Sequence, residues 1–287
     1  MNPQPIYLPH NLHPAYHLRY SWTGWPSDGV FPKPPNDQFL KDLAPDWERD
    51  GLRLLEHLWT DEMIQLSFST KPDVSPVLVA TRAKGRLDYA LRTADHPCHF
   101  SRKVAIRSVG DNTTPIVEQY IENQVAKSSY IDPRFKDFLD QFTRVDDSVD
   151  LSQPTATLSG RYWYNLHLVL VVVERRPIVD EKSLAVIRDR SFQIAARKEY
   201  GLRVLSVRPD HVHMALRGNV EQSPQEIALA FQNNLAFALG QNAVWSHNYY
   251  VGTFGEYNMN AIRLRARESA SPAGQAGGGR IGGASAG

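Results

Sequence analysis

Residues 200–218 read YGLRVLSVRPDHVHMALRG, and this stretch has a counterpart earlier in the chain. Residues 50–59, DGLRLLEHLW, share its Gly-Leu-Arg followed by an apolar pair. Residues 63–68 (MIQLSF) then fall on residues 211–216 (HVHMAL) at an offset of 148. Because the order of the matches is preserved, we interpret the chain as an internal duplication, and the repeat decides the expected fold.

Each half follows the same plan of strand, helical segment, two strands, helix, strand and a last helix. The opening strands are residues 15–22 and 164–173, which are rich in aromatic and branched side chains. Residues 76–92 and 224–239 begin with proline, which suits a first helical turn, and repeat apolar residues at helical spacing. The sequence therefore predicts an α+β protein with two tandem ferredoxin-like domains, each an antiparallel sheet with helices packed on it.

The chain of 287 residues, 42% hydrophobic and 22% charged, is long enough for two modest domains with real cores. Polar, turn-rich residues separate the two repeats, and the end of the chain is rich in Gly, Ala and Ser. We expect a first domain at residues 1–143, a linker at 144–160, a second domain at 161–268 and a disordered tail at 269–287.

Several features predict a cytoplasmic protein that does not enter a membrane. The longest apolar run, Leu168 to Val173, is far shorter than a membrane-spanning helix needs and is typical of a buried strand. The N-terminus lacks the basic start and apolar core of a signal peptide. A single cysteine, Cys98, permits no internal disulfide.

His211 and His213 stand one residue apart between apolar positions, so a strand would point both imidazoles to the same face. Two neutral imidazoles held in this way can share a metal ion. The same pattern also fits a hydrogen-bonded polar pair, and the choice between the two depends on the rest of the chain.

Basic residues gather in one part of the first half, although the formal net charge is only +1. A local excess of cations can follow a phosphate backbone, while a solvated helix face would have the same composition. The candidate DNA-binding residues are Arg82, Lys84, Arg86, Arg92, Arg102, Lys103 and Arg107.

The second half resembles the one-tyrosine HUH transposases, that is, the TnpA-type and REP-associated tyrosine transposases. The likeness lies in YNLHLVLVVVERRPIV, GLRVLSVRPDHVHMALRG and AVWSHNYYVGTFG, which follow the family's order of motifs. In that family the last helix carries a tyrosine followed four residues later by glutamine. Here the second half has Arg265 and Ser269 at those positions, whereas the first half has Tyr120 and Gln124.

The two halves are defective in complementary ways, because the histidine positions of the first half are Met63 and Gln65. Family members resemble dimers in which the helix of one subunit completes the histidine site of the other. A fused pseudo-dimer would keep one complete site. Tyr120 and Gln124, four apart on a helix, would then share a face, although a half-buried helix tyrosine is the alternative reading of Tyr120.

The resemblance implies a nuclease and strand transferase that acts on single-stranded, hairpin-containing DNA. Tyr120 would attack phosphorus and form a covalent 5′-phosphotyrosine, and Mg²⁺ or Mn²⁺ would be held by His211, His213 and Gln124. Asp210 would orient a histidine, or it would serve only in a turn. Tyr257, close to Gly255, is an alternative but displaced nucleophile.

Two other functions stay open at the level of sequence. One is a catalytically inactive protein that binds DNA hairpins, and the other is a metal-dependent hydrolase that uses His211 and His213 without a tyrosine adduct. The feature that discriminates is whether Tyr120 reaches the histidine pair, because a tyrosine hydroxyl far from the histidines would favour the protein that only binds DNA. A fused pseudo-dimer has already covered its dimer surface, so a monomer is preferred over a dimer.

Overall fold

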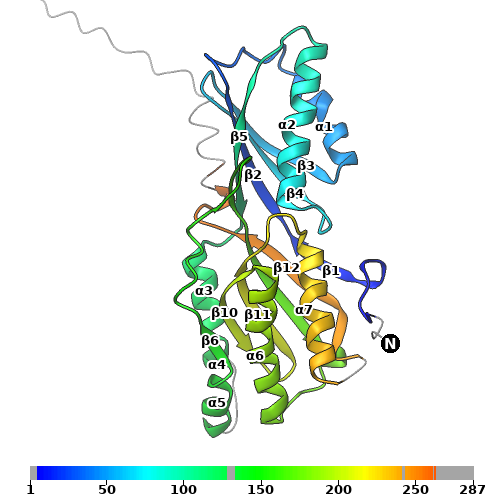
Figure 1. The fold of residues 1–287 in the computed structure, drawn as a ribbon, viewed down its shortest axis with the longest axis vertical. Coiled ribbons are helices and arrows are strands. Elements are labelled where there is room, and N and C mark those ends of the chain that lie inside the picture. Colours follow the sequence, from blue (N-terminus) through cyan, green and yellow to red (C-terminus); the bar gives the residue numbers. More distant parts are fainter. Residues whose placement is uncertain (1–4, 128–132, 241–242, 261, 263–287) are drawn as a thin grey trace, which may run out of the picture.

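The computed structural model describes residues 5–127, 133–240, 243–260 and 262. Two six-stranded sheets and the helices packed on them form an elongated molecule (Figure 1). The α+β architecture predicted from the sequence is therefore confirmed. The expected tail, 269–287, lies outside the described residues.

Sheet B lies in the upper part of Figure 1, with α1 (Phe39–Arg49) and α2 (Pro76–Thr93) on it. Its strands, in spatial order, are β3 (Leu52–Trp59), β4 (Ile64–Thr70), β2 (Arg19–Pro26), β5 (Phe100–Val109), β8 (Gly160–Trp163) and β7 (Thr155–Ala156). The predicted opening strand, residues 15–22, is divided in the structure: its first residues belong to a strand of the other sheet, and its last residues begin β2, a central strand of sheet B.

Sheet A lies in the lower part of Figure 1, with α6 (Glu181–Lys198) and α7 (Pro224–Ala238) in front of it. The order β10-β11-β9-β12-β1 repeats the order β3-β4-β2-β5-β8 of sheet B, so the repeated segments occupy equivalent strands. The strands in order are β1 (His13–His17), β12 (Trp245–Phe254), β9 (Asn165–Val172), β11 (His211–Arg217), β10 (Gly201–Val207) and β6 (Thr143–Val145).

Local sequence explains the two helices that begin with proline. The Ser75 side chain accepts a hydrogen bond from the Leu78 amide at the start of α2, and Ser223 forms a capping box with Glu226 at the start of α7. In each helix proline occupies the first turn, where an amide hydrogen is not needed. Both helices bury an apolar stripe, which includes Leu87 in α2 and Phe231 in α7.

The two halves exchange their first strands. β1 precedes β2 in sequence but pairs in parallel with β12 of sheet A, and β8 precedes β9 but pairs in parallel with β5 of sheet B. The segment 144–160, expected as a linker, contributes to both β6 and β7. Within the described residues the chain therefore passes between the sheets four times, and the domain boundaries drawn from the sequence stay a prediction.

The exchange extends to the helix that follows β5. After β5 the chain turns at Gly110 and enters α3 (Thr114–Glu122), whose Val117 and Ile121 pack against Val204 and Ala215 of sheet A. α4 (Gln124–Lys127) and α5 (Pro133–Asp140) continue down the same edge in Figure 1. A helix from the first half thus covers the sheet of the second half.

A close crossing of backbones fixes this exchange. A Cβ atom on Gly110 would lie 2.3 Å from the carbonyl oxygen of Thr253, and one on Gly255 would lie 2.3 Å from that of Ser108. Thr113 and Gly255 also form an isolated parallel bridge. Only glycine leaves room for such an approach. None of the helices in the described part of the chain is long and apolar enough to cross a membrane.

Candidate functional site

Strand β11 places His211 and His213 on the face of sheet A that α3 covers, which we call the histidine face. Alternation along the strand sends Val212 and Met214 into the main core, while Ala215 packs with α3. His213 is 6% exposed, and His211 is partly buried. Their ring centroids lie 4.8 Å apart, so the two rings can approach one ligand.

Each of these imidazoles is oriented by a neighbour at its Nδ1 atom. Asp210 Oδ1 lies 2.6 Å from Nδ1 of His211, and Arg175 in turn donates to Asp210 over 2.8 Å. His167 Nε2 on β9 lies 3.0 Å from Nδ1 of His213. The Nε2 atoms of His211 and His213 are therefore the atoms that could hold a metal ion, in the arrangement that outer partners impose on metal-binding histidines.

Burial keeps the imidazoles of His213 and His167 unprotonated. Desolvation lowers the pKa of His213 to about 2, helped by His167, His211 and Arg208, and burial lowers the pKa of His167 to about 4. Burial alone would raise the pKa of Asp210, but the hydrogen bond to His211 and the charge of Arg175 bring it below its ordinary value. The two buried imidazoles are neutral near pH 7, which is the form that binds metals.

Tyr120 comes to the histidine face from the other half of the chain. It lies on α3, and its ring centroid is 5.7 Å from that of His213 and 5.9 Å from that of His167, in both cases edge to face. Its side chain is 41% exposed, so a substrate can reach it. The structure thus brings together Tyr120 and His213, which the sequence places 93 residues apart.

The expectation of a single helix carrying both Tyr120 and Gln124 is wrong. α3 ends at Glu122, Asn123 has a non-helical ψ of 13°, and Gln124 begins the separate helix α4. Gln124 Nε2 donates to the main-chain carbonyl of Tyr120 over 2.9 Å. The amide side chain therefore caps the end of α3, and its carbonyl oxygen is the atom that could bind a cation.

Two residues of the histidine face were missed by the sequence reasoning. His167 stands within the strand YNLHLVLV, where its alternation with buried leucines places it on the same face as His213. Tyr250 on β12 has its ring 5.6 Å from that of His167, and its hydroxyl occupies the space above Gly252. The polar position in an otherwise apolar strand was the available signal for His167.

His211 and His213 offer two nitrogen ligands of the kind that a divalent cation could use. No group of three His, Cys, Asp or Glu side chains is arranged for a metal among the residues that the structure describes. The rings of His211 and His213 approach each other, whereas the partner of the Gln124 side chain is the Tyr120 carbonyl, so its place as a third ligand stays a prediction. Imidazole suits manganese better than magnesium, whereas the amide oxygen suits either.

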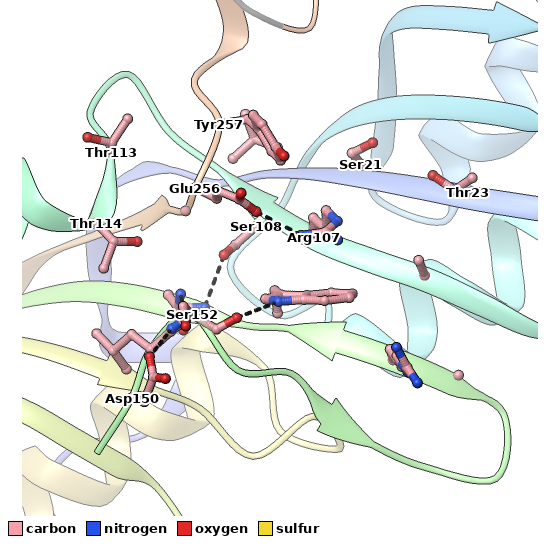
Figure 2. Close-up of a pocket in the computed structure, with 18 of the residues that line it drawn as sticks. Ser21, Thr23, Arg107, Ser108, Thr113, Thr114, Asp150, Ser152, Glu256 and Tyr257 are labelled. Atoms are coloured by element: carbon pink, nitrogen blue, oxygen red, sulfur yellow. Dashed lines mark hydrogen bonds and ion pairs between the residues drawn. The ribbon is translucent and has the colours of Figure 1, made fainter. Parts of the chain in front are cut away.

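The equivalent face of sheet B forms a groove of about 1370 Å³ (Figure 2). Gln65 pairs with Thr23 as His213 pairs with Val169, so Gln65 occupies the position of His213. Ser21 lies two residues before Thr23, as His167 lies two residues before Val169, so Ser21 occupies the position of His167. Gln65 Nε2 donates to Ser21 Oγ over 2.7 Å. The hydrogen bond is kept, but the imidazoles are replaced, so this face lacks the nitrogen ligands of sheet A.

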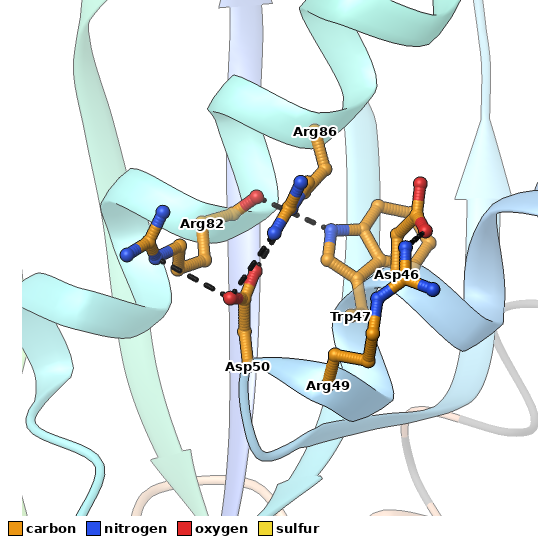
Figure 3. Close-up of polar contacts among 6 residues, drawn as sticks. All are labelled: Asp46, Trp47, Arg49, Asp50, Arg82 and Arg86. Carbon is orange, nitrogen blue, oxygen red and sulfur yellow. Dashed lines mark hydrogen bonds and ion pairs between the residues drawn. The ribbon is translucent and has the colours of Figure 1, made fainter.

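The candidate DNA-binding residues fall into two groups. Arg82 and Arg86 on α2 pair with Asp50 at 3.6 and 2.9 Å (Figure 3), and Asp50 has a lowered pKa chiefly through its hydrogen bond to Arg86. Arg92 pairs with Asp88, and Lys84 donates to the Ser101 carbonyl. These four helix residues lie on one side of sheet B.

The other group lies on β5. Lys103 and Arg107 line the groove on the opposite side of sheet B, and alternation points Arg102 away from it. The cluster seen in the sequence is therefore not one surface. Tyr257, the displaced alternative nucleophile, also lines the groove rather than the histidine face, with its ring centroid 6.0 Å from the Arg107 guanidinium.

Comparison with known proteins gives one family and several distant structures. The family model described as IS200-like transposase matches residues 161–264. A protein from Deinococcus radiodurans described as a transposase is 18% identical, with coverage of 38% of this chain and 92% of the other, at a TM-score of 0.30. A REP-associated tyrosine transposase bound to a REP hairpin is 13% identical, with coverage of 36% and 62%, at a TM-score of 0.28. No curated protein matches the chain.

Proposed function

We propose that the chain is a metal-dependent endonuclease and strand transferase of single-stranded, hairpin-containing DNA, because residues 161–264 match the model of the IS200-like transposase family. Tyr120 is the proposed nucleophile, and the intermediate is a covalent 5′-phosphotyrosine. The supporting observation is the approach of the Tyr120 ring to within 6 Å, between centroids, of both His167 and His213. A helix that served only to cover the sheet would need no phenol there.

The chemistry follows from the groups on the histidine face. Attack by the Tyr120 oxygen forms a bond to phosphorus while the bond from phosphorus to the 3′ oxygen breaks. The phenol loses its proton, the leaving 3′ oxygen gains one, and the energy of the phosphodiester is retained for rejoining. Nε2 of His211, Nε2 of His213 and the Gln124 amide oxygen would hold Mg²⁺ or Mn²⁺, which would offset charge on the phosphate oxygens.

The proposal is tested by incubating the protein and Mn²⁺ with a single-stranded hairpin DNA labelled at its 3′ end, so that the label stays on the strand joined to Tyr120, followed by a denaturing gel. A labelled band at the mass of a protein–DNA adduct is the expected result, together with a free 3′-hydroxyl on the released strand. Tight binding without adduct would support instead a hairpin-binding protein. Cleavage with no adduct would support the hydrolase that works without a tyrosine.

His167 is proposed as the residue that positions His213. For His213 to hold a metal through Nε2, its Nδ1 must carry the hydrogen and donate it to Nε2 of His167. We therefore expect His167→Phe to weaken Mn²⁺ binding about 10- to 100-fold, the usual cost of losing such an outer partner. His167→Gln retains an acceptor and should recover most of that affinity.

The measurement is the signal of free Mn²⁺ in an electron paramagnetic resonance titration, which does not require activity. Thermal unfolding of both variants controls for packing, because His167 is largely buried. Equal Mn²⁺ affinity in His167→Phe and the wild-type protein would contradict the positioning role.

A further inference from the structure

The groove on sheet B occupies the place that the histidine face has on sheet A. Two rows of paired residues cross this face of sheet B, the first being Gln65, Thr23, Ala105 and Arg161 and the second Ser67, Ser21, Arg107 and Trp163; all of them except Ser67 line the groove. By the same registers Arg107 stands where sheet A has Gly252, and Trp163 stands where it has His17. Arg107 and Trp163 thus present large flat groups where sheet A has glycine and histidine.

Arg107 and Trp163 form a stacked platform in this groove. The guanidinium carbon of Arg107 lies 3.5 Å from the centre of the Trp163 ring, and its Nη1 is 3.3 Å from Glu256 Oε2 (Figure 2). Trp163 Nε1 donates to the Ser152 carbonyl over 2.8 Å, so the indole is held in position. Trp25, which is 39% exposed, lines the same groove. Such flat surfaces accept unpaired bases with little dependence on their identity.

Two cations stand at the end of the groove away from its acidic residues. In Figure 2, Asp150 lies at one end of the view and Thr23 at the other. Arg161 is in the same row of paired residues as Thr23, and it therefore lies at the end away from Asp150. Lys103 lines the groove one alternation farther along β5. Both side chains are exposed, and neither forms an ion pair with any residue that the structure describes. They are available for phosphates.

We infer that the sheet B groove binds an unpaired segment of DNA without cutting it. Bases stack on Trp25 and on the Arg107–Trp163 platform, while Lys103 and Arg161 contact the phosphates. The inference rests on the proposed function in that the same DNA would be cut at the histidine face. It adds a second strand-binding site, built on the face that lost its imidazoles.

The test uses the full chain and an oligothymidylate in the presence of EDTA, so that no cleavage intervenes. The double variant Lys103→Ala/Arg161→Ala should bind on the order of tenfold more weakly at low salt. The logarithmic salt dependence should become shallower by about 1.4, which is two phosphate contacts at roughly 0.7 each on a single strand. Trp25→Ala should weaken binding by about tenfold and reduce the quenching of tryptophan fluorescence by the oligonucleotide.

The matched control removes two lysines from helices, Lys41→Ala/Lys182→Ala, and should leave both the affinity and the salt slope unchanged. Both of these lysines are exposed, on α1 and α6. Equal losses in the two double variants would show only a general effect of charge and would overturn the inference. Unchanged binding by the groove variants would overturn it as well.

The outcome is separable from that of the nuclease assay. At saturating hairpin DNA with Mn²⁺, the groove variants should still form the covalent adduct, because Tyr120 and the histidines are intact. A failed nuclease proposal would show as no adduct in the wild-type protein, whereas a failed groove shows as unchanged oligothymidylate binding.

Discussion

Replacing Tyr120 by phenylalanine should abolish the covalent protein–DNA adduct, a fall of at least about a thousandfold, while DNA binding stays nearly unchanged. The substitution removes the oxygen that attacks phosphorus but leaves the ring against His167 and His213. The adduct is measured on a denaturing gel with labelled hairpin DNA and Mn²⁺. Binding is measured on a native gel with the same DNA.

The nearest matched control is Tyr250→Phe, because Tyr250 presents another phenol on the histidine face, 5.6 Å from His167 between ring centroids. This variant should retain most of the adduct. Persistence of the adduct in Tyr120→Phe would contradict the assignment, and its loss in Tyr250→Phe alone would identify that residue as the nucleophile.

The order of strands and helices in both halves could be predicted because it depends on local sequence patterns. The alternation of HVHMAL and the proline-initiated apolar stripes specify β11, α2 and α7 without reference to the rest of the chain. The match of residues 63–68 to 211–216 also predicts equivalent strands, and β4 and β11 occupy equivalent places in their sheets.

The exchange of strands could not be predicted in the same way. β1 has no local feature that selects β12 over a neighbour in its own half, since the choice depends on how the two sheets face each other. The exchange of strands also determines where α3 lies, because the close crossing of backbones at Gly110 and Gly255 places α3 on sheet A. The complementarity of the two halves is visible in the sequence, whereas the path that joins them is a tertiary property.

Side-chain partners explain the other differences. Arg82 and Arg86 look available in sequence, but Asp50 is more than 30 residues away and pairs with both. The interruption of the helix at Asn123 moves Gln124 to a capping position that helical spacing does not foresee. The role proposed for His167 follows only from the 3.0 Å contact between its Nε2 and Nδ1 of His213, and His213 lies on a neighbouring strand.

His213→Ala should remove cleavage and weaken Mn²⁺ binding by about a hundredfold or more, since it deletes a proposed ligand rather than an outer partner. The matched control is Gln65→Ala at the equivalent position of sheet B, which should leave both quantities nearly unchanged. Because His213 is buried, thermal unfolding must accompany the assay, and His211→Ala at a more exposed site gives a second measurement. If Gln65→Ala were as damaging as His213→Ala, the first half would still contain a working site.

Mixing Tyr120→Phe with His213→Ala should restore no adduct if Tyr120 and His213 act within one chain, because every such site then lacks one essential group. Recovery would require α3 of one molecule to cover sheet A of another. Within one chain α3 already buries Val117 and Ile121 against that sheet, and the turn before it is fixed by the bridge between Thr113 and Gly255. The tethered helix is present at a far higher effective concentration than a helix from a second molecule, so exchange is disfavoured. Adduct formation in the mixture, absent from each variant alone, would instead place the site between two chains.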